Sequence, residues 1–258
     1  MLAPLTIAHA ACKGHAPENT LAGIEAALRL GVDAIEIDVH ASRDGVPMLI
    51  HDATVDRTTN GQGTVADLTL AQLRALDAGG DLFGGRFRGA RMPTLAAVLD
   101  LTRGRCVLVI EIKARAIEQL IAETIRRADA ARRSMIWSFE PEVVSAARML
   151  MPDVPAAQLA GERVDDLGRL LNDTVARNAQ AISIHWSRVT PALVRAARLR
   201  GLSVFTWTAD EPADQARVAA AGVDGIVTNV PDILRRTLAE GCYEGLAELS
   251  AGDSARPA

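Results

Sequence analysis

The sequence predicts an α/β protein with the fold of a (β/α)8 TIM barrel that carries a small insertion after its second strand. Short apolar runs of strand character alternate with segments of helical period, and this strand-plus-helix unit occurs eight times. The 258 residues, 49% of them hydrophobic, suffice for one large core, and no Gly/Ser- or Pro-rich linker divides them. An open doubly wound sheet is the main alternative, but no G-x-G-x-x-G pattern follows the first strand.

The first two units carry the strongest local signals. Leu5 to His9 is a short strand, and a helix follows from about Thr20 to Leu30, where Gly31 ends it. The next strand, residues 34–40, alternates branched apolar side chains with ionisable ones. The ionisable residues are Glu36, Asp38 and His40. Because successive side chains in a strand point to opposite faces, these three share one face.

The segment over about residues 52–93 breaks this rhythm. Pro47 to His51 is predicted as a returning extended run after a tight turn, and the residues beyond it are rich in Thr, Gly and Asp. One amphipathic helix is expected over about Thr69 to Leu76. We therefore predict a single barrel domain over residues 1–240 with an inserted subdomain at 52–93, and a flexible C-terminal tail over 241–258.

The remaining units follow in regular order after a helix at Leu95 to Leu101. The expected strands are Cys106 to Lys113, Met135 to Phe139, Ala156 to Leu159, Ala181 to His185, Ser203 to Thr208 and Gly225 to Thr228. The expected helices are Ile117 to Ala130, Glu142 to Met151, Val164 to Ala176, Pro191 to Leu199, Pro212 to Ala220 and Asp232 to Ala239. Repeated β-α units of this length indicate parallel strands.

Charge and cysteine content narrow the class of partner. The net charge of −4 comes from 28 basic and 32 acidic residues without a basic stripe, which argues against nucleic acid or an anionic membrane as the partner. A small soluble substrate is favoured, and stable membrane association is not expected; the pattern leaves the oligomeric state open. Cys12, Cys106 and Cys242 form no C-x-x-C pattern and no basic, apolar leader opens the chain, so we expect a cytoplasmic protein.

Ionisable residues gather at the predicted carboxyl ends of the early strands, where a barrel of this type holds its working residues. They are His9, Glu36, Asp38, His51, Glu111 and Lys113. Three carboxylates without thiolates favour one hard divalent cation, Mg²⁺ or Ca²⁺, over zinc. A purely structural ion-pair cluster is the alternative, but unpaired buried charges cost several kcal/mol each, which favours a functional site.

Histidine and lysine usage adds to this pattern. His9 and His51 both end extended runs at the edge where the carboxylates cluster, so they are candidates for general acid and base. We expect His40 and His185 to be wall or supporting residues and His15 to lie in a loop. Because Lys13 and Lys113 are the only lysines, a metal, two histidines and a lysine together describe a pocket for an anion such as a phosphate.

These residues resemble the glycerophosphodiester phosphodiesterase family. The matching motifs span residues 5 to about 235. They are His9, Ala16 to Thr20, Glu-Ile-Asp-Val-His from Glu36, Asp-Gly-Val-Pro from Asp44, Ile50-His51-Asp52, Asp-Arg-Thr-Thr-Asn-Gly from Asp56, Glu-Ile-Lys from Glu111, Ser138-Phe139, Thr206 to Thr208, and Gly222 to Ile226 with Pro231-Asp232. The resemblance implies a TIM barrel with a small insertion after the second strand.

The resemblance also implies an activity and its residues. It implies metal-dependent hydrolysis of glycerophosphodiesters to glycerol 3-phosphate and an alcohol, through a cyclic phosphate formed by the glycerol 2-hydroxyl. Glu36, Asp38 and Glu111 would hold the divalent cation. His9 and His51 would perform the acid/base chemistry, Lys113 would contact the phosphate, and Trp207 would line the alcohol-side pocket.

Two positions depart from the family pattern. The chain has His9-Ala10-Ala11 where the family usually has His-Arg-Gly, so a phosphate-binding arginine is missing, and Asn229 stands where an aspartate is common. Lys13 or Arg43 is the candidate replacement. Two alternative functions follow: a phosphodiesterase retuned to another diester, such as a lysophospholipid or a non-natural ester, or a metal- and phosphate-binding barrel with little turnover.

Overall fold

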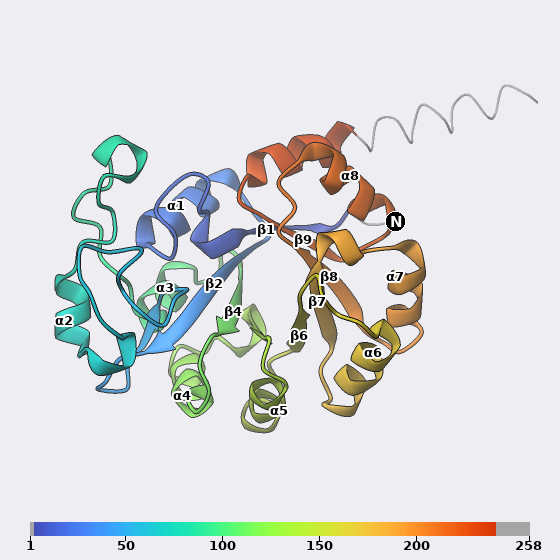
Figure 1. Cartoon of the computed structure of the whole chain (residues 1–258), viewed down its shortest axis with the longest axis horizontal. Helices are drawn as coiled ribbons and strands as arrows, with labels where there is room; N and C mark the ends of the chain where they lie inside the picture. Colours follow the sequence, from blue (N-terminus) through green and yellow to red (C-terminus); the bar gives the residue numbers. More distant parts are fainter. Residues whose placement is uncertain (1–2, 241–258) are drawn as a thin grey trace, which may run out of the picture.

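The computed structural model describes residues 3–240 and confirms the predicted barrel (Figure 1). Eight parallel strands form a closed ring, because β1 (Leu5–Ala8) pairs with both β9 (Gly225–Thr228) and β2 (Ala34–Ala41). The other five strands follow in chain order between β2 and β9. They are β4 (Val107–Ile112), β5 (Ser134–Ser138), β6 (Ala156–Ala160), β7 (Ala181–His185) and β8 (Ser203–Trp207).

A helix follows each strand of the ring and lies outside it (Figure 1). The helices are α1 (Leu21–Leu30), α3 (Leu95–Leu101), α4 (Glu118–Arg127), α5 (Pro141–Leu150), α6 (Leu167–Ala176), α7 (Pro191–Arg198), α8 (Pro212–Ala220) and a last helical segment over residues 231–240. Several begin at capping residues: the hydroxyl of Thr20 accepts the Gly23 N–H at the start of α1. The sequence signal for such caps explains why predicted and observed helix starts differ by only a few residues.

The predicted insertion follows β2. Strand β3 (Pro47–Leu49) returns antiparallel to β2, and α2 (Leu70–Ala75) lies farther along, before α3. Figure 1 shows this teal segment projecting beyond α1 and α3. Apolar side chains of β3, of the residue after it and of the insertion form a small separate cluster, which holds the insertion against β3: Met48, Ile50, Val55, Val65, Leu73 and Met92. The division into one domain, subdomain and tail stays a prediction, and residues 241–258 lie outside the described residues.

Strand alternation divides the buried side chains between two layers. In β2, Ile35, Ile37 and Val39 pack outward with the residues of the surrounding helices. The barrel interior has a separate cluster, in which the rings of Trp137 and Phe205 lie 5.3 Å apart between centroids. The other face of β2 therefore points Glu36 and Asp38 into the barrel, as the alternation predicts.

Candidate active site

Three carboxylates meet inside the carboxyl end of the barrel. Glu36 and Asp38 lie on β2 and Glu111 lies on β4, where Glu111 is the direct register partner of Asp38. One oxygen atom from each residue can be chosen so that all three lie within 4.8 Å of one another. Glu36 and Asp38 are almost completely buried, and Glu111 is largely so. The parallel register of β2 and β4 thus assembles the triad that the sequence predicts.

The polar partners of the triad leave one acceptor unfilled. Oε2 of Glu36 accepts the backbone N–H of Ala10 at 2.8 Å, whereas its buried Oε1 has no hydrogen-bond partner. Nζ of Lys113 lies 2.8 Å from Oε1 of Glu111 and 3.5 Å from Oδ1 of Asp38. One ammonium therefore faces three carboxylates. An orphaned buried oxygen within an oxygen-only ligand set is the arrangement that a hard divalent cation fits.

The pKa shifts have the same origin. Burial raises the pKa of Glu36 well above its usual value, and the charges of Asp38 and Glu111 raise it further. Burial also raises the pKa of Glu111, against the opposing effect of Lys113. Burial acts to lower the pKa of Lys113, but the charges of Glu111 and Asp38 outweigh it, and its pKa is raised. The lysine stays charged, and the triad still carries surplus negative charge when ionised.

The His9 ring is hydrogen-bonded to the side-chain amide of Asn229. The residue directly follows β1, and its Nδ1 lies 2.7 Å from Oδ1 of Asn229. Nδ2 of Asn229 donates to Asp210 at 2.7 Å, so the amide must turn its oxygen toward His9, which donates from Nδ1–H. Burial lowers the pKa of His9, although the Asn229 bond opposes this effect. The ring is therefore neutral near pH 7, with a free Nε2 that lies 4.0 Å from Oε2 of Glu36.

His51 lies beyond β3 at the rim of the same pocket. Its Nδ1 lies 2.7 Å from Oδ1 of Asp52, which leaves Nε2 free. Its backbone carbonyl accepts Nε2–H of His40 at 3.2 Å, so His40 is a supporting residue as predicted. Both candidate catalytic histidines thus have an acceptor at Nδ1 and a free Nε2.

One pocket joins these groups to an apolar wall. Its lining residues are His9, Glu36, His51, Glu111, Lys113, Trp137, Phe139, Leu159, Trp207 and Val227. The Trp207 ring packs edge-to-face against both Phe139 and His185, with centroids 5.5 Å apart in each pair. Lys113 and Trp207, which the resemblance assigns to substrate binding, therefore share a pocket with both histidines. The pocket has a charged side and an aromatic side.

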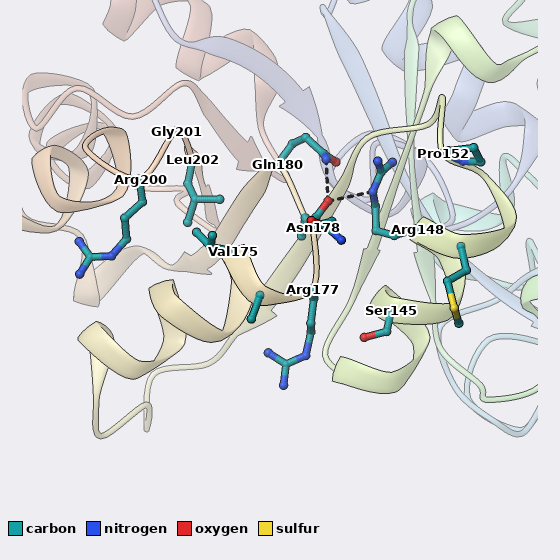
Figure 2. Close-up of a pocket in the computed structure, with 13 residues that line it drawn as sticks. Ser145, Arg148, Pro152, Val175, Arg177, Asn178, Gln180, Arg200, Gly201 and Leu202 are labelled. Atoms are coloured by element: carbon teal, nitrogen blue, oxygen red, sulfur yellow. Dashed lines mark hydrogen bonds between the residues drawn. The ribbon is translucent and has the colours of Figure 1, made fainter.

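A larger cavity, of about 780 Å³, lies at the opposite end of the barrel. Figure 2 shows the side chains that line it. Residues of α5, of the end of α6 and of the loops that precede β6, β7 and β8 line it. Two of its three arginines are bonded within the chain: Arg148 donates to the carbonyls of Asn178 and Val154, and Arg200 donates to Asn172. No carboxylate and no histidine lines this cavity in the described part of the chain, so it lacks the residue types that gather at the other end.

Comparison with known proteins places the chain. The model of the glycerophosphoryl diester phosphodiesterase family matches residues 9–233, which is most of the sequence. The chain belongs to this family. A glycerophosphodiester phosphodiesterase of Caldanaerobacter subterraneus is 36% identical over 245 residues, covering 92% of this chain and 98% of the relative. One of Bacillus subtilis is 30% identical over 250 residues, covering 90% and 85%. The predicted family and enzyme class are thereby confirmed.

Solved structures agree with this assignment. A glycerophosphodiester phosphodiesterase from Agrobacterium tumefaciens superimposes on this family member with a TM-score of 0.80 at 32% identity, covering 90% of this chain and 98% of that one. A phosphodiesterase from Oleispira antarctica, solved with the product sn-glycerol-3-phosphate, gives a TM-score of 0.83 at 25% identity, covering 92% and 97%. This member of the family thus shares its barrel fold with both of these solved structures.

The loop after β1, where Ala10 and Ala11 depart from the family pattern, has a constrained backbone. Ala10, Ala11 and Cys12 all have positive φ angles, of 44°, 60° and 80°. The loop presses on α1 so closely that a Cβ on Gly23 would lie 2.2 Å from the carbonyl oxygen of Ala11. Ala10 is buried and its N–H holds Glu36, so the departure lies next to the triad. Burial raises the pKa of the Cys12 thiol to about 12, so this thiol is unreactive at neutral pH.

The two predicted replacements for the missing arginine do not line the pocket. Lys13 instead pairs with Glu18, with Nζ 3.1 Å from Oε2, and half of its side chain is exposed. Arg43 is an exposed residue of the turn after β2, and its backbone N–H bonds to Leu68. Its side chain has no polar partner among the described residues. The structure thus leaves position 10 without a substitute cation in place.

Several supporting residues were not singled out from the sequence. Asn19 grips Asp38 from both sides: its Nδ2 donates to Oδ2 of Asp38 at 2.8 Å, and its Oδ1 accepts the Asp38 N–H at 3.1 Å. Asp52 is hydrogen-bonded to His51 and also accepts from Arg57. Asp210 accepts from the Asn229 amide and so orients it. Asn19 and Arg57 lie inside motifs on which the family resemblance rests, which was the available signal.

We expect Asn19→Ala to destabilise the protein by about 2–4 kcal/mol, because it leaves a buried carboxylate oxygen and a buried N–H of Asp38 unpaired. Asn19 also has a φ of 54°, which favours Asn over Ala. Asn178→Ala is the matched control, since Asn178 has a φ of 56° but its exposed side chain makes no such bonds among the described residues. Urea unfolding of both variants measures the difference, and equal losses would mean that only the backbone conformation matters.

The described residues include no helix that combines the length and the apolar character needed to cross a bilayer. The predicted cytoplasmic location stays a prediction.

Proposed function

We propose that the pocket hydrolyses glycerophosphodiesters to glycerol 3-phosphate and an alcohol, with His9 and His51 as the acid/base pair and a divalent cation at the carboxylate triad. One observation carries this proposal: two histidines, each with a free Nε2, line one pocket with Glu36, Glu111 and Lys113. General acid/base catalysis needs two such nitrogens at one reacting centre.

The triad of Glu36, Asp38 and Glu111 would hold the cation, Mg²⁺ or Ca²⁺. Bound there, such an ion neutralises phosphoryl charge and lowers the pKa of a coordinated hydroxyl. The unpartnered Oε1 of Glu36 supports this assignment. The Ala10 N–H bonds to Glu36 and the Asn19 amide bonds to Asp38, so the protein supplies a rigid ligand set.

The histidines would move the protons. In the first step, Nε2 of one histidine accepts the proton of the glycerol 2-hydroxyl, while the oxygen of that hydroxyl forms a bond to phosphorus. The bond from phosphorus to the alcohol oxygen breaks, and the other histidine, which starts this step protonated at Nε2, gives that oxygen its Nε2 proton. In the second step water opens the cyclic phosphate and the two roles reverse, so both residues return to their starting states. Lys113 would donate to a phosphoryl oxygen.

The aromatic side of the pocket would bind the uncharged part of the substrate. Trp207 and Phe139 present apolar ring surface next to the charged groups. We propose Trp207 as the contact for the carbon skeleton of the substrate.

Release of glycerol 3-phosphate from a panel of diesters, with chelator and then with Mg²⁺ or Ca²⁺ restored, tests the proposal. We expect release only with a cation present. Binding of diesters without product in any combination would favour the alternative of a binding protein, and turnover of a lysophospholipid alone would favour a retuned enzyme.

The alanine at position 10, where the family usually has an arginine, allows a sharper test of these alternatives. We expect Ala10→Arg to raise kcat/KM for a simple glycerophosphodiester by up to about 10²-fold, since a placed guanidinium bond to a phosphate is worth roughly 3 kcal/mol in the transition state. The matched variant Lys13→Ala should leave kcat/KM within about twofold, because Lys13 binds Glu18 instead of lining the pocket.

Kinetics of both variants on a small and a bulky diester separate the possibilities. A gain on the small diester with a loss on the bulky one would indicate that the space at Ala10 serves a larger substrate. A large loss in Lys13→Ala would show that Lys13 leaves Glu18 to reach the phosphate. No change in either variant would mean that position 10 does not face the phosphate.

A further inference from the structure

Arg57, in the inserted segment, joins two carboxylates behind His51. Its Nε and Nη2 donate to the Asp52 carboxylate at 2.6 and 3.0 Å, and its Nη1 and Nη2 donate to Glu18 at 3.0 and 2.7 Å. The guanidinium thus makes a two-pronged contact with each partner. Such paired bonds fix orientation as well as distance.

The two carboxylates differ in their surroundings. The side chain of Glu18 is only 8% exposed and lies in the segment that leads into α1, so it provides a fixed anchor on the barrel. Asp52 is more exposed and belongs to the start of the insertion. Oδ1 of Asp52 accepts from both Nη2 of Arg57 and Nδ1 of His51. A continuous chain of bonds therefore runs from Glu18 through Arg57 and Asp52 to His51.

His51 needs such support because packing does not supply it. Nearly half of its side chain is exposed, 47%, and the residue follows a strand of only three residues. An exposed imidazole samples several rotamers unless a partner selects one. The bond at Nδ1 selects both the rotamer and the tautomer, and leaves Nε2 directed at the pocket.

We propose that Arg57 is a positioning residue for catalysis, which holds Asp52 against Nδ1 of His51 and so aims Nε2 of His51 into the pocket. The proposal rests on the function proposed for His51. It also assigns a task to the insertion, whose Arg57 connects the barrel anchor Glu18 to a histidine of the active site. Arginine suits this task better than lysine, because its planar fork bonds two carboxylates in fixed directions.

Two properties of the contact support this assignment. The hydrogen bonds from Arg57 keep the pKa of the Asp52 carboxyl well below its usual range, so the acceptor for His51 stays ionised at any working pH. Glu18 also forms an ion pair with Lys13, and it makes this pair and its contacts with Arg57 at the same time. The chain of bonds from Glu18 to His51 is therefore made entirely of protein groups.

Steady-state kinetics test the proposal. Loss of a group that orients a catalytic residue typically costs about 10–100-fold, so we expect Arg57→Ala to lower kcat by that factor with KM within about threefold. Arg57→Lys should recover part of the loss. Arg88→Ala is the control, because Arg88 forms an ion pair with Asp81 in the same insertion, and its kcat should not change. A kcat for Arg57→Ala equal to that of Arg88→Ala would overturn the proposal.

A double-mutant comparison separates positioning from general damage to the site. If Arg57 acts through His51, then Arg57→Ala should cause no further loss in a His51→Ala background. A loss of the same factor in both backgrounds would mean that Arg57 acts elsewhere.

Nitrogen chemical shifts of the His51 ring give a readout that does not depend on turnover. The wild-type protein should show the Nδ1–H tautomer, and both Arg57→Ala and Asp52→Asn should shift it toward a mixture. An unchanged ring spectrum in both variants would overturn the proposal. Should His51→Ala retain full turnover, the function proposed for His51 fails, while the ring spectrum still decides whether Arg57 positions it.

Discussion

Replacing any one carboxylate of the triad with its uncharged isostere is expected to lower turnover by about 10³-fold or more, because each variant removes an oxygen ligand from the proposed cation site. The variants are Glu36→Gln, Asp38→Asn and Glu111→Gln. Each should also weaken the binding of Mg²⁺ or Ca²⁺, and chelation of the wild-type protein should produce the same loss. The shape of the site is retained in these variants, since an amide replaces a carboxylate of equal size.

Calorimetric titration of the cation and the release of glycerol 3-phosphate measure the two effects. Glu123→Gln serves as the control, because Glu123 is an α4 carboxylate that pairs with Arg127 and lies away from the pocket. Turnover that survives full chelation would show that the triad does not act through a cation.

The same Glu36→Gln variant, which should lose turnover, should gain stability. Burial and two neighbouring carboxylates raise the pKa of Glu36, so ionisation is harder in the folded protein than in the unfolded chain. A raised carboxyl pKa means that its contribution to stability is present below the unfolded pKa and is lost as pH rises through the folded pKa. Without a cation, Glu36→Gln should therefore melt at a higher temperature than the wild type, by a margin that grows as the pH rises above the pKa of the carboxyl in the unfolded chain.

His9→Ala and His51→Ala are each expected to lower kcat by about 10²-fold or more while cation binding persists, since a general acid or base contributes about that factor. Neither residue belongs to the triad, and the Glu36 bond to the Ala10 N–H does not involve the His9 ring. His15→Ala is the matched control: His15 is a histidine outside the pocket, with its Nε2 2.9 Å from Asp232.

Kinetics, cation titration and thermal melting of the three histidine variants check this result. Loss of turnover with intact cation binding and melting would agree with proton transfer by both residues. If His9→Ala or His51→Ala unfolds, the same comparison with His→Gln at that position decides, and a folded His→Gln variant with wild-type turnover would assign a structural role to that histidine.

The barrel was predictable because its signals are local. The order of strands and helices follows from the period of apolar residues, and the helix starts follow from caps such as Thr20. The facing of Glu36 and Asp38 follows from alternation within one strand. Their meeting with Glu111 follows from the next parallel strand, since neighbouring strand ends lie together.

The sequence alone determined the fold, the family resemblance and the residue types at the strand ends, because periodicity and motif spacing report which face of an element a side chain occupies. Only the tertiary structure decided how those side chains are held. Asn229 reaches His9 across 220 residues of chain, and Arg57 reaches Glu18 across 39. Local patterns carry no information about such contacts, because they depend on the closure of the barrel and on the path of the insertion. The missing partner of Oε1 of Glu36 and the raised pKa of that carboxyl likewise arise only from burial beside the charges that closure brings together.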